Sequence, residues 1–191
     1  MAVSALGLAL QDRGIPAISL TASQCGIRTN GVFNWARIRS IDTRRILKEL
    51  EEGRVVIITG FQGVNEAEEI TTLGRGGSDV TAAAVASALG ASVCEICTDV
   101  PGVLSADPQL VGNARVWPEL SYEEAIELAS SGAKVLHPRA AEICMSYQIP
   151  IHVRSSFSDD SGTWIKAGDS TMEQAEVVGV TSDKGIAKIT L

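Results

Sequence analysis

Short apolar runs alternate with amphipathic stretches along most of the chain. Uninterrupted aliphatic and β-branched runs predict strands, and these lie at 15–20, 54–58, 91–97 and 149–153. Periodic apolar positions between the runs predict helices, and these lie at 1–13, 42–52, 78–90, 121–130 and after residue 138.

Capping signals support several of these boundaries. Asp42 is a plausible N-cap, and Gly53 is suited to ending the helix that it begins. Ser121 with Glu124 three residues later has the pattern of a capping box. Pro138 fits the first turn of a helix, where its missing N–H costs nothing.

Strands that alternate with helices predict a mainly parallel sheet covered by helices on both faces, a three-layer α/β fold. Ligands of such sheets bind at the carboxyl ends of the strands. The pattern changes after Val153: residues 155–172 are polar and rich in turn formers. Two further strands are predicted at 176–180 and 186–191, which indicates the beginning of a second domain.

Composition narrows the class of protein. The 191 residues are 45% hydrophobic and 4% aromatic, with a formal net charge of −7. There is no long basic run, which disfavours nucleic acid or an anionic membrane as partner. No apolar run approaches the roughly 18 residues of a membrane-spanning helix.

Cys94 and Cys97 form a Cys-x-x-Cys pair, which can bind zinc or carry redox chemistry. They fall in a predicted strand, where residues three apart point to opposite faces. His137 and His152 are isolated in the sequence and offer no second ligand pair. Buried, reduced thiols are the better interpretation.

The strongest candidate site is the run from Thr71 to Asp79, which leads directly into a helix. Its glycines allow close backbone approach, and N–H groups at a helix N-terminus bind anions. Arg75 adds a fork that suits a carboxylate or a phosphate. The alternative is a structural turn with Ser78 or Asp79 as N-cap. The run matches neither the G-x-G-x-x-G fingerprint nor a Walker loop.

Three other segments are candidates for chemistry. Residues 98–108 hold two aspartates after a strand and could contact a nucleotide sugar or Mg²⁺, or form an ordinary connection. Lys134 lies in a Gly-Ala-flanked turn and could reach inward or remain solvated, whereas His137 is more plausibly structural. Phe61, between glycines, could wall a small-molecule pocket or pack in the core.

Together these segments resemble the aspartate kinases of the amino acid kinase family, over nearly the whole chain. The string Leu-Gly-Arg-Gly-Gly-Ser-Asp at 73–79 is the most specific, because it separates aspartate kinases from the glutamate, acetylglutamate and uridylate kinases that share the fold. The segments 21–27, 60–63, 98–103 and 134–139 are also similar to motifs of that family.

The resemblance implies a carbamate-kinase-like αβα fold and ATP-dependent phosphorylation of the L-aspartate side chain to L-4-aspartyl phosphate. This is the first step of lysine, threonine and methionine biosynthesis in that family, and it uses ATP and Mg²⁺ in the cytoplasm. The implied catalytic residues are Asp79, Arg75 and Lys134. The implied aspartate-binding residues are Phe61, Arg75, Gly76, Gly77 and Ser78. The implied ATP-binding residues are Ser78, Thr98, Asp99, Leu104, Ser105, Ala106, Asp107, Pro108, Gln109, Lys134 and Val135.

The resemblance also implies a division of the chain. Residues 1–168 would be part of the kinase domain, and 169–191 would be a linker with the first strands of an ACT-like regulatory domain. A full-length protein of this kind would bind lysine or threonine as effector and form a homo-oligomer through the complete ACT region.

The chain departs from the family pattern at several points. Leu104 stands where the family commonly has Tyr, and Gln109 where it has Arg, which would weaken nucleotide binding. The Lys-Phe-Gly-Gly-Thr-Ser and Ser-x-Gly-Glu motifs that precede these segments in the family do not occur in the 191 residues. We therefore expect weak or no activity of the isolated chain. The alternatives are a non-catalytic regulatory or partner chain, or another member of the family.

Overall fold

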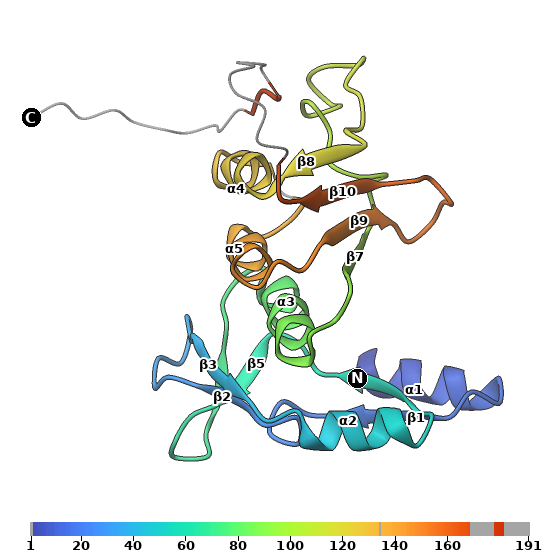
Figure 1. Ribbon diagram of the computed structural model, residues 1–191, viewed down its shortest axis with the longest axis vertical. Helices are drawn as coiled ribbons and strands as arrows, with labels where there is room; N and C mark the ends of the chain where they lie inside the picture. Colours follow the sequence, from blue (N-terminus) through green and yellow to red (C-terminus); the bar gives the residue numbers. More distant parts are fainter. Residues whose placement is uncertain (1, 134, 169–177, 182–191) are drawn as a thin grey trace, which may run out of the picture. The chain divides into compact units, whose positions relative to one another are not determined.

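The computed structural model describes residues 2–133, 135–168 and 178–181 (Figure 1). The chain divides into two compact units, Met1–Leu89 (unit 1) and Gly90–Leu191 (unit 2). Each unit has its own sheets and its own buried residues, and each is described separately below.

Unit 1 contains three helices and six short strands. In chain order they are α1 (Ala2–Asp12), β1 (Ala17–Leu20), β2 (Ile27–Thr29), β3 (Ile38–Ile41), α2 (Arg44–Glu51), β4 (Val55–Ile58), β5 (Gln62–Val64), β6 (Ile70–Thr72) and α3 (Gly77–Leu89). Strands β1 and β4 pair in parallel, from Ala17 opposite Val55 to Leu20 opposite Ile58. A second sheet has the order β3-β2-β5-β6, with one parallel and two antiparallel pairs.

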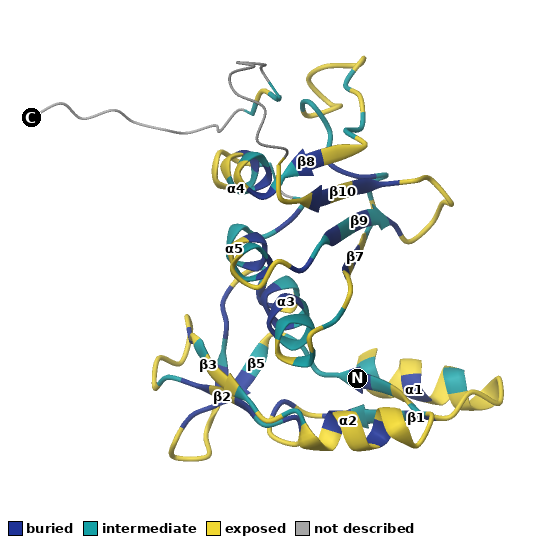
Figure 2. Cartoon of the chain, viewed as in Figure 1, coloured by how far each residue is buried: buried dark blue, intermediate teal, exposed yellow. Residues whose placement is uncertain are grey.

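Aliphatic side chains from several of these elements make one core of unit 1. Its buried members are Leu20, Ala22, Cys25, Ile27 and Ile46. Each is at most 2% exposed. The helices at the edge of this core remain largely exposed on their outer faces (Figure 2), and α1 buries only Gly7. The core therefore depends on strand side chains more than on helix α1.

Helix α2 begins one residue later than expected. Its N-cap is Thr43, and the Asp42 carboxylate accepts the backbone N–H of Arg44 at 3.2 Å. The Arg44 guanidinium also bonds this carboxylate, at 2.5 Å between Nη2 and Oδ2, and holds the pKa of Asp42 at about 2. Asp42 thus organises the start of the helix without being its cap.

Glu49 is the buried acid of α2, with its side chain 3% exposed. The Arg45 Nε lies 2.6 Å from one oxygen of its carboxylate. Arg54, which directly precedes β4, binds the other oxygen. The Arg54 hydrogen bond, aided by Arg45, lowers the pKa of the Glu49 carboxyl below its ordinary value of 4.5. The ion pairs let an acid face the core side of an amphipathic helix.

Unit 2 alternates strands and helices more regularly. Its elements are β7 (Cys94–Thr98), β8 (Glu119–Ser121), α4 (Tyr122–Ser130), α5 (Pro138–Ser146), β9 (Ile151–Ser155) and β10 (Thr163–Lys166). The sheet order is β7-β9-β10-β8. Strands β7 and β9 are parallel over five pairs, from Cys94 opposite Ile151 to Thr98 opposite Ser155, and β10 is parallel to β8 but antiparallel to β9.

Two predicted helix starts are confirmed in unit 2. Ser121 accepts the backbone N–H of Glu124 at 3.2 Å, and the Glu124 carboxylate accepts the Ser121 N–H at 2.7 Å, which is the predicted capping box. Pro138 occupies the first turn of α5, and His137 is its N-cap, with Nδ1 accepting the Arg139 N–H at 3.2 Å. His137 therefore has a structural role at this helix.

The predicted α/β class is confirmed, with a more mixed sheet than the strand–helix pattern suggested. The strands that were predicted as loop or not recognised are β2, β3, β5, β6, β8 and β10, and the antiparallel pairs are β2 with β3, β5 with β6 and β9 with β10. Of the two strands predicted at the C-terminus, 176–180 and 186–191, only residues 178–180 are described, and they are irregular. The rest of both lies outside the described residues.

The capping box makes a measurable contribution to stability. Ser121→Ala should lower the free energy of unfolding by about 1 kcal/mol, because the Glu124 N–H loses its acceptor at the start of α4. Urea unfolding followed by circular dichroism measures this difference. Ser130→Ala, in the exposed last turn of the same helix, is the control and should change stability little. Equal effects of the two substitutions would contradict the capping role.

The Glu49 ion pairs predict a pH-dependent contribution. Because the folded-state pKa is lowered, the stabilisation is present above the ordinary value of 4.5 and is lost as pH falls through the folded value. Glu49→Gln should therefore destabilise the chain clearly at about pH 7 and progressively less towards about pH 3. Urea midpoints across this range provide the measurement. The exposed Glu51→Gln is the control, and a destabilisation by Glu49→Gln that grew on acidification would refute the assignment.

Candidate functional site

The backbone after β4 approaches the start of α3 very closely. A Cβ atom added to Gly60 would lie 3.4 Å from the Cα of Ser78. One added to Gly77 would lie 2.9 Å from the Leu73 Cβ and 3.0 Å from a ring carbon of Phe61. Glycine is thus required at Gly77 for the first turn of α3 to pack against Leu73 and Phe61.

The hydroxyl group of Thr81 joins these two segments. It donates to the Gly77 carbonyl oxygen at 2.9 Å and accepts the Phe61 N–H at 3.0 Å. The Phe61 carbonyl oxygen in turn accepts the Leu73 N–H at 2.9 Å. Phe61 has φ 73°, a conformation that is rare for a residue with a side chain, and the residue is 43% exposed. The hydrogen bonds hold Phe61 in this strained conformation with its ring outward.

The glycine-rich turn between β6 and α3 presents Arg75. Gly74 and Gly76 both have positive φ, 84° and 70°, and the Gly77 N–H bonds the Gly74 carbonyl oxygen at 3.0 Å. Arg75 is exposed, whereas Gly74 and Gly77 on either side are buried. The turn therefore places a guanidinium group outside a backbone that is fixed by steric contact.

The N-terminus of α3 adds polar groups beside Arg75. Ser78 is exposed and Asp79 half-buried, with the Ser78 hydroxyl 3.3 Å from the Asp79 carboxylate. An arginine fork and a helix N-terminus together can bind a carboxylate group. Unit 1 therefore brings together Phe61, Arg75, Gly76, Gly77 and Ser78, the five residues predicted to bind aspartate, together with Asp79. Thr81, which sequence reasoning missed, connects them.

Of the predicted nucleotide residues, Ser78 lies in unit 1 at the start of α3, and the others belong to unit 2. Thr98 ends β7, and its hydroxyl lies 3.1 Å from the carboxylate of the exposed Asp99. The Ser156 N–H bonds the Thr98 carbonyl oxygen at 2.7 Å, so the ends of the parallel strands β7 and β9 are tied together. Polar groups at the carboxyl ends of neighbouring parallel strands are where ligands bind in open α/β sheets.

The segment from Leu104 to Gln109 is a folded loop. Leu104 bridges to Val116, and the Ser105 N–H bonds the Arg115 carbonyl oxygen at 2.9 Å. The Asp107 carboxylate accepts the Gln109 N–H at 2.8 Å. Ser105 and Ala106 are half-buried, and residues 107–109 are exposed. The loop is thus ordered by its own contacts, with its tip open to a ligand.

Lys134 lies outside the described residues, so the predicted contact of this lysine with phosphate stays a prediction. Val135 next to it is half-buried. The structure thus groups the predicted residues into two sets, one in each unit, from Phe61 to Asp79 and from Thr98 to Val135.

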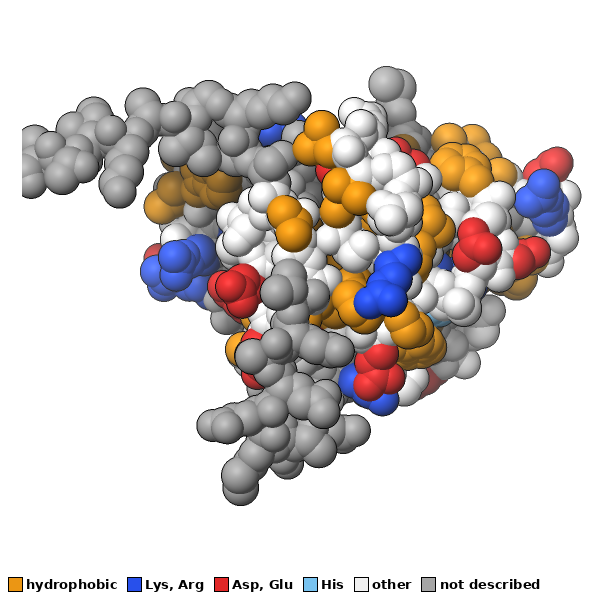
Figure 3. Space-filling view, turned by 90° about the horizontal axis from the view of Figure 1, so that it is seen from above, with side chains coloured by type: hydrophobic (Ala, Val, Ile, Leu, Met, Phe, Trp, Pro, Cys, Tyr) orange, Lys and Arg blue, Asp and Glu red, His pale blue; other side chains and the backbone are white. Residues whose placement is uncertain are grey.

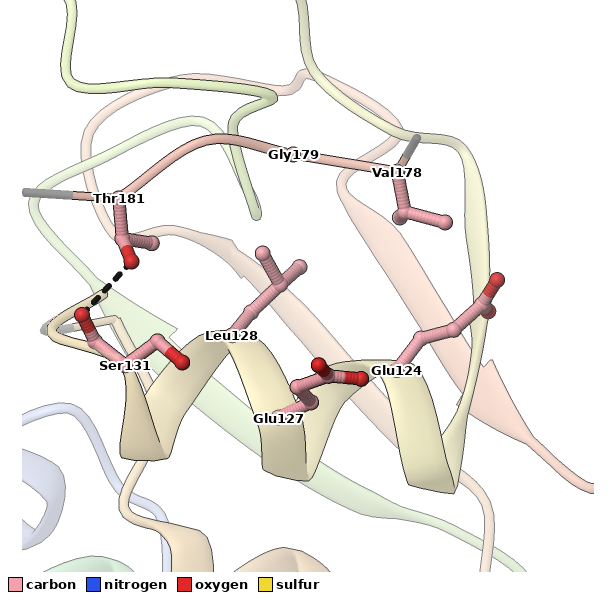
Figure 4. Close-up of a pocket in the computed structure, with 7 residues that line it drawn as sticks. All are labelled: Glu124, Glu127, Leu128, Ser131, Val178, Gly179 and Thr181. Carbon is pink, nitrogen blue, oxygen red and sulfur yellow. Dashed lines mark hydrogen bonds between the residues drawn. The ribbon is translucent and has the colours of Figure 1, made fainter. Parts of the chain in front are cut away.

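A cavity of about 280 Å³ lies in unit 2 between α4 and residues 178–181 (Figure 4). Two acids from α4, Glu124 and Glu127, line it, and the Thr181 hydroxyl donates to the Ser131 carbonyl oxygen at 2.6 Å. Carboxylates repel phosphate groups at short range. This cavity therefore does not suit a nucleotide.

A wider hollow of about 470 Å³ in unit 1 is lined by four cations. They are Arg28, Arg44, Arg45 and Lys48. The three arginines are already paired with acids of unit 1, at 2.5 to 2.6 Å. Ion pairs with these acids offset the charge of the three arginines in this hollow.

The two cysteines of the Cys-x-x-Cys pair differ in burial. Cys94 is 5% exposed and Cys97 is exposed, as expected for opposite faces of β7, so the predicted burial is right for Cys94 and wrong for Cys97. Burial raises the pKa of Cys25 to about 11, and a hydrogen bond with Cys94 raises the pKa of Cys144. In the part of the chain that the structure describes, no three His, Cys, Asp or Glu side chains are grouped as metal ligands.

The sequence has no long basic run, and the drawn surface shows its positive charges scattered (Figure 3). On the face drawn in Figure 3, the described Lys and Arg side chains lie in small groups between acidic and hydrophobic ones. A nucleic-acid-binding face would gather positive charge into a stripe or patch. Within the described ranges, none of the helices has the length and apolar character needed to cross a membrane.

The chain is similar in sequence and in structure to known aspartokinases. Aspartokinase 2 of Bacillus subtilis is 50% identical over 190 residues, which is 99% of this chain and 46% of that protein. The crystal structure of Escherichia coli aspartokinase III in complex with aspartate and ADP has a TM-score of 0.76 and 38% identity, over 84% of this chain and 37% of that one. Its structure in complex with lysine and aspartate has a TM-score of 0.71 over the same shares.

The chain thus spans about half the length of the curated relatives that it matches. The model of the amino acid kinase family matches residues 2–155, most of the 191 residues. The chain therefore belongs to the amino acid kinase family.

Proposed function

We propose that the chain is the part of an aspartate kinase that binds L-aspartate in unit 1 and ATP in unit 2. The observation that carries the proposal is the Gly74–Gly77 turn, in which steric contact fixes the backbone while Arg75 stays exposed. The aspartokinases with which the chain shares about half its residues support this substrate.

In the proposed reaction, a side-chain carboxylate oxygen of L-aspartate attacks the γ-phosphorus of ATP. The bond from this phosphorus to the bridging oxygen breaks, ADP leaves with the electron pair, and L-4-aspartyl phosphate forms. No covalent bond to the protein is needed, so catalysis consists of positioning and charge neutralisation. Arg75 holds a carboxylate of the substrate, Ser78 and the N-terminus of α3 add hydrogen-bond donors, and Phe61 borders the site.

ATP would bind at the carboxyl ends of β7 and β9. Thr98 and Asp99 would contact the nucleotide, and the exposed tip of the loop at 107–109 would close over it. Lys134 would neutralise phosphate charge. Mg²⁺ would be bound to the ATP phosphates, where it needs only one or two protein carboxylates, and it would withdraw charge from the transferring group. Asp79, half-buried at the start of α3, is the carboxylate that we assign to organise this centre.

We further propose that residues 1–168 belong to the kinase domain and that 169–191 lead into an ACT-like module. In the whole protein this module would bind lysine or threonine and join subunits into a homo-oligomer. The enzyme would act in the cytoplasm at the first step of lysine, threonine and methionine biosynthesis. Support comes from the family resemblance and from the relatives, which are about twice as long.

The proposal is tested by joining the chain to the remaining half of B. subtilis aspartokinase 2, in place of the matching 190 residues. ADP release should depend on L-aspartate and saturate with it, whereas L-glutamate and uridine monophosphate should give no turnover above background. Turnover with either of these in place of aspartate would overturn the substrate assignment.

If aspartate binds in unit 1 and ATP in unit 2, substitutions in the two units should affect the KM values of different substrates. Arg75→Lys keeps the charge but loses the planar fork, and should raise the KM for aspartate about tenfold or more with little change in the KM for ATP. Asp99→Asn should show the reverse, because its carboxylate lies at the nucleotide end of β7. Initial rates over both substrate ranges measure the split. Arg39→Lys, on exposed β3, is the control; a shift of both KM values by either site variant would contradict the division.

A further inference from the structure

The loop between β2 and β3 packs on the strand that leads into the Arg75 turn. The Thr72 N–H bonds the Phe33 carbonyl oxygen at 2.7 Å, and the Ala36 N–H bonds the Thr72 carbonyl oxygen at 2.9 Å. The Thr72 hydroxyl adds a second bond to the Phe33 oxygen, at 3.1 Å. The loop is closed on itself by Asn30, whose side chain accepts the Arg37 N–H at 3.0 Å. The loop and the turn therefore form one connected piece of backbone.

Trp35 is the side chain that this loop sets against the turn. A Cβ atom added to Gly74 would lie 2.7 Å from Cε3 of Trp35 and 3.0 Å from two more of its ring carbons. The indole thus covers the open face of Gly74, the residue directly before Arg75. Even so, Trp35 is 60% exposed, so much of the ring is available to something else.

The turn is consequently bordered by an aromatic ring at each end. Trp35 touches Gly74, and the Phe61 ring touches Gly77, where an added Cβ would lie 3.0 Å from it. Both rings are exposed by more than two fifths, although large aromatic side chains are usually well buried. Arg75 lies between these two glycines in the chain and is itself exposed.

We propose that Trp35 is a positioning residue for Arg75 and the second wall of the aspartate site. The inference rests on the proposed function, since it concerns how that site holds its substrate. The indole fixes the Gly74 end of the turn by contact, as Phe61 does at Gly77. Its exposed part borders the bound amino acid and keeps water from the guanidinium–carboxylate pair.

Two physical effects connect the Trp35 ring to the binding of aspartate by Arg75. A guanidinium fork binds a carboxylate through two directed hydrogen bonds, so a small shift of the Arg75 backbone loses one of them. Charged pairs are also much weaker when water reaches them freely, and an apolar wall reduces that access. Removing the ring should therefore weaken aspartate binding and leave the predicted nucleotide residues of unit 2, from Thr98 to Val135, unaffected.

The experiment uses the chain joined to the remaining half of B. subtilis aspartokinase 2. Trp35→Ala should raise the KM for L-aspartate about tenfold or more, with the KM for ATP unchanged within about twofold. Trp35→Phe keeps a flat ring on Gly74 and should restore most of the aspartate affinity. Val32→Ala, on the same loop and 50% exposed, is the matched control and should behave like the unchanged protein.

Indole fluorescence gives a readout that a purely structural role would not change. Aspartate should alter the emission of the unchanged protein in a saturable way. That change should be absent from Trp35→Phe, which should still bind aspartate in calorimetry. Normal aspartate KM in Trp35→Ala, or an aspartate-dependent emission change that persists in Trp35→Phe, would overturn the inference alone. Absence of aspartate saturation in the unchanged protein would overturn the proposed function and the inference together.

Discussion

The close packing of the first turn of α3 against the Gly60–Phe61 backbone is the contact on which the proposed carboxylate site depends. At Gly77 there is no room for a Cβ atom, and at Gly60 one would touch Ser78. Thr81 adds the hydrogen bonds that keep the two segments together. A turn held in this way cannot relax when a ligand arrives, so Arg75 is presented without a cost of ordering the backbone on binding.

This constraint also explains how an acidic protein can select anionic ligands. With a net charge of −7, the overall field would repel the proposed ligands aspartate and ATP, so their affinity would have to come from local groups. The arginines at positions 28, 45 and 54 are bound to glutamates of the fold and stabilise unit 1. Arg75 takes part in none of the ion pairs found among the described residues. Its charge remains available to a carboxylate, which matches the geometry of its fork.

Sequence reasoning was reliable where the signal is local. The Ser121 capping box and the Pro138 helix start depend on residues three or four positions apart, and both are confirmed. The glycine turn and its following helix were also predicted. The three-residue strand β5 was missed because it pairs with the distant strand β2, and β6 was missed because it forms by pairing with β5.

The same distinction holds within the site. Motif resemblance assigned Arg75 and Phe61 to one site, and in the structure Phe61 contacts Gly77 and bonds Leu73, the two residues that flank the turn carrying Arg75. The role of Thr81 could not be predicted, because a threonine inside a helix usually bonds only its own preceding turn. Only the fold shows that the Phe61 N–H reaches it from twenty residues away.

The loop proposed to bind the nucleotide is anchored differently from the proposed carboxylate site, and this bears on its departures from the family pattern. The buried Thr163 hydroxyl accepts the Val103 N–H at 2.9 Å and donates to the Trp117 carbonyl oxygen at 2.6 Å, so β10 holds both ends of the loop. Neither bond involves the side chains of Leu104 or Gln109. Their difference from the Tyr and Arg common in the family therefore leaves the path of the loop intact and alters only what its surface offers to a nucleotide. A weaker nucleotide contact at Leu104 and Gln109 would then be a matter of missing stacking area and charge, not of a misfolded loop.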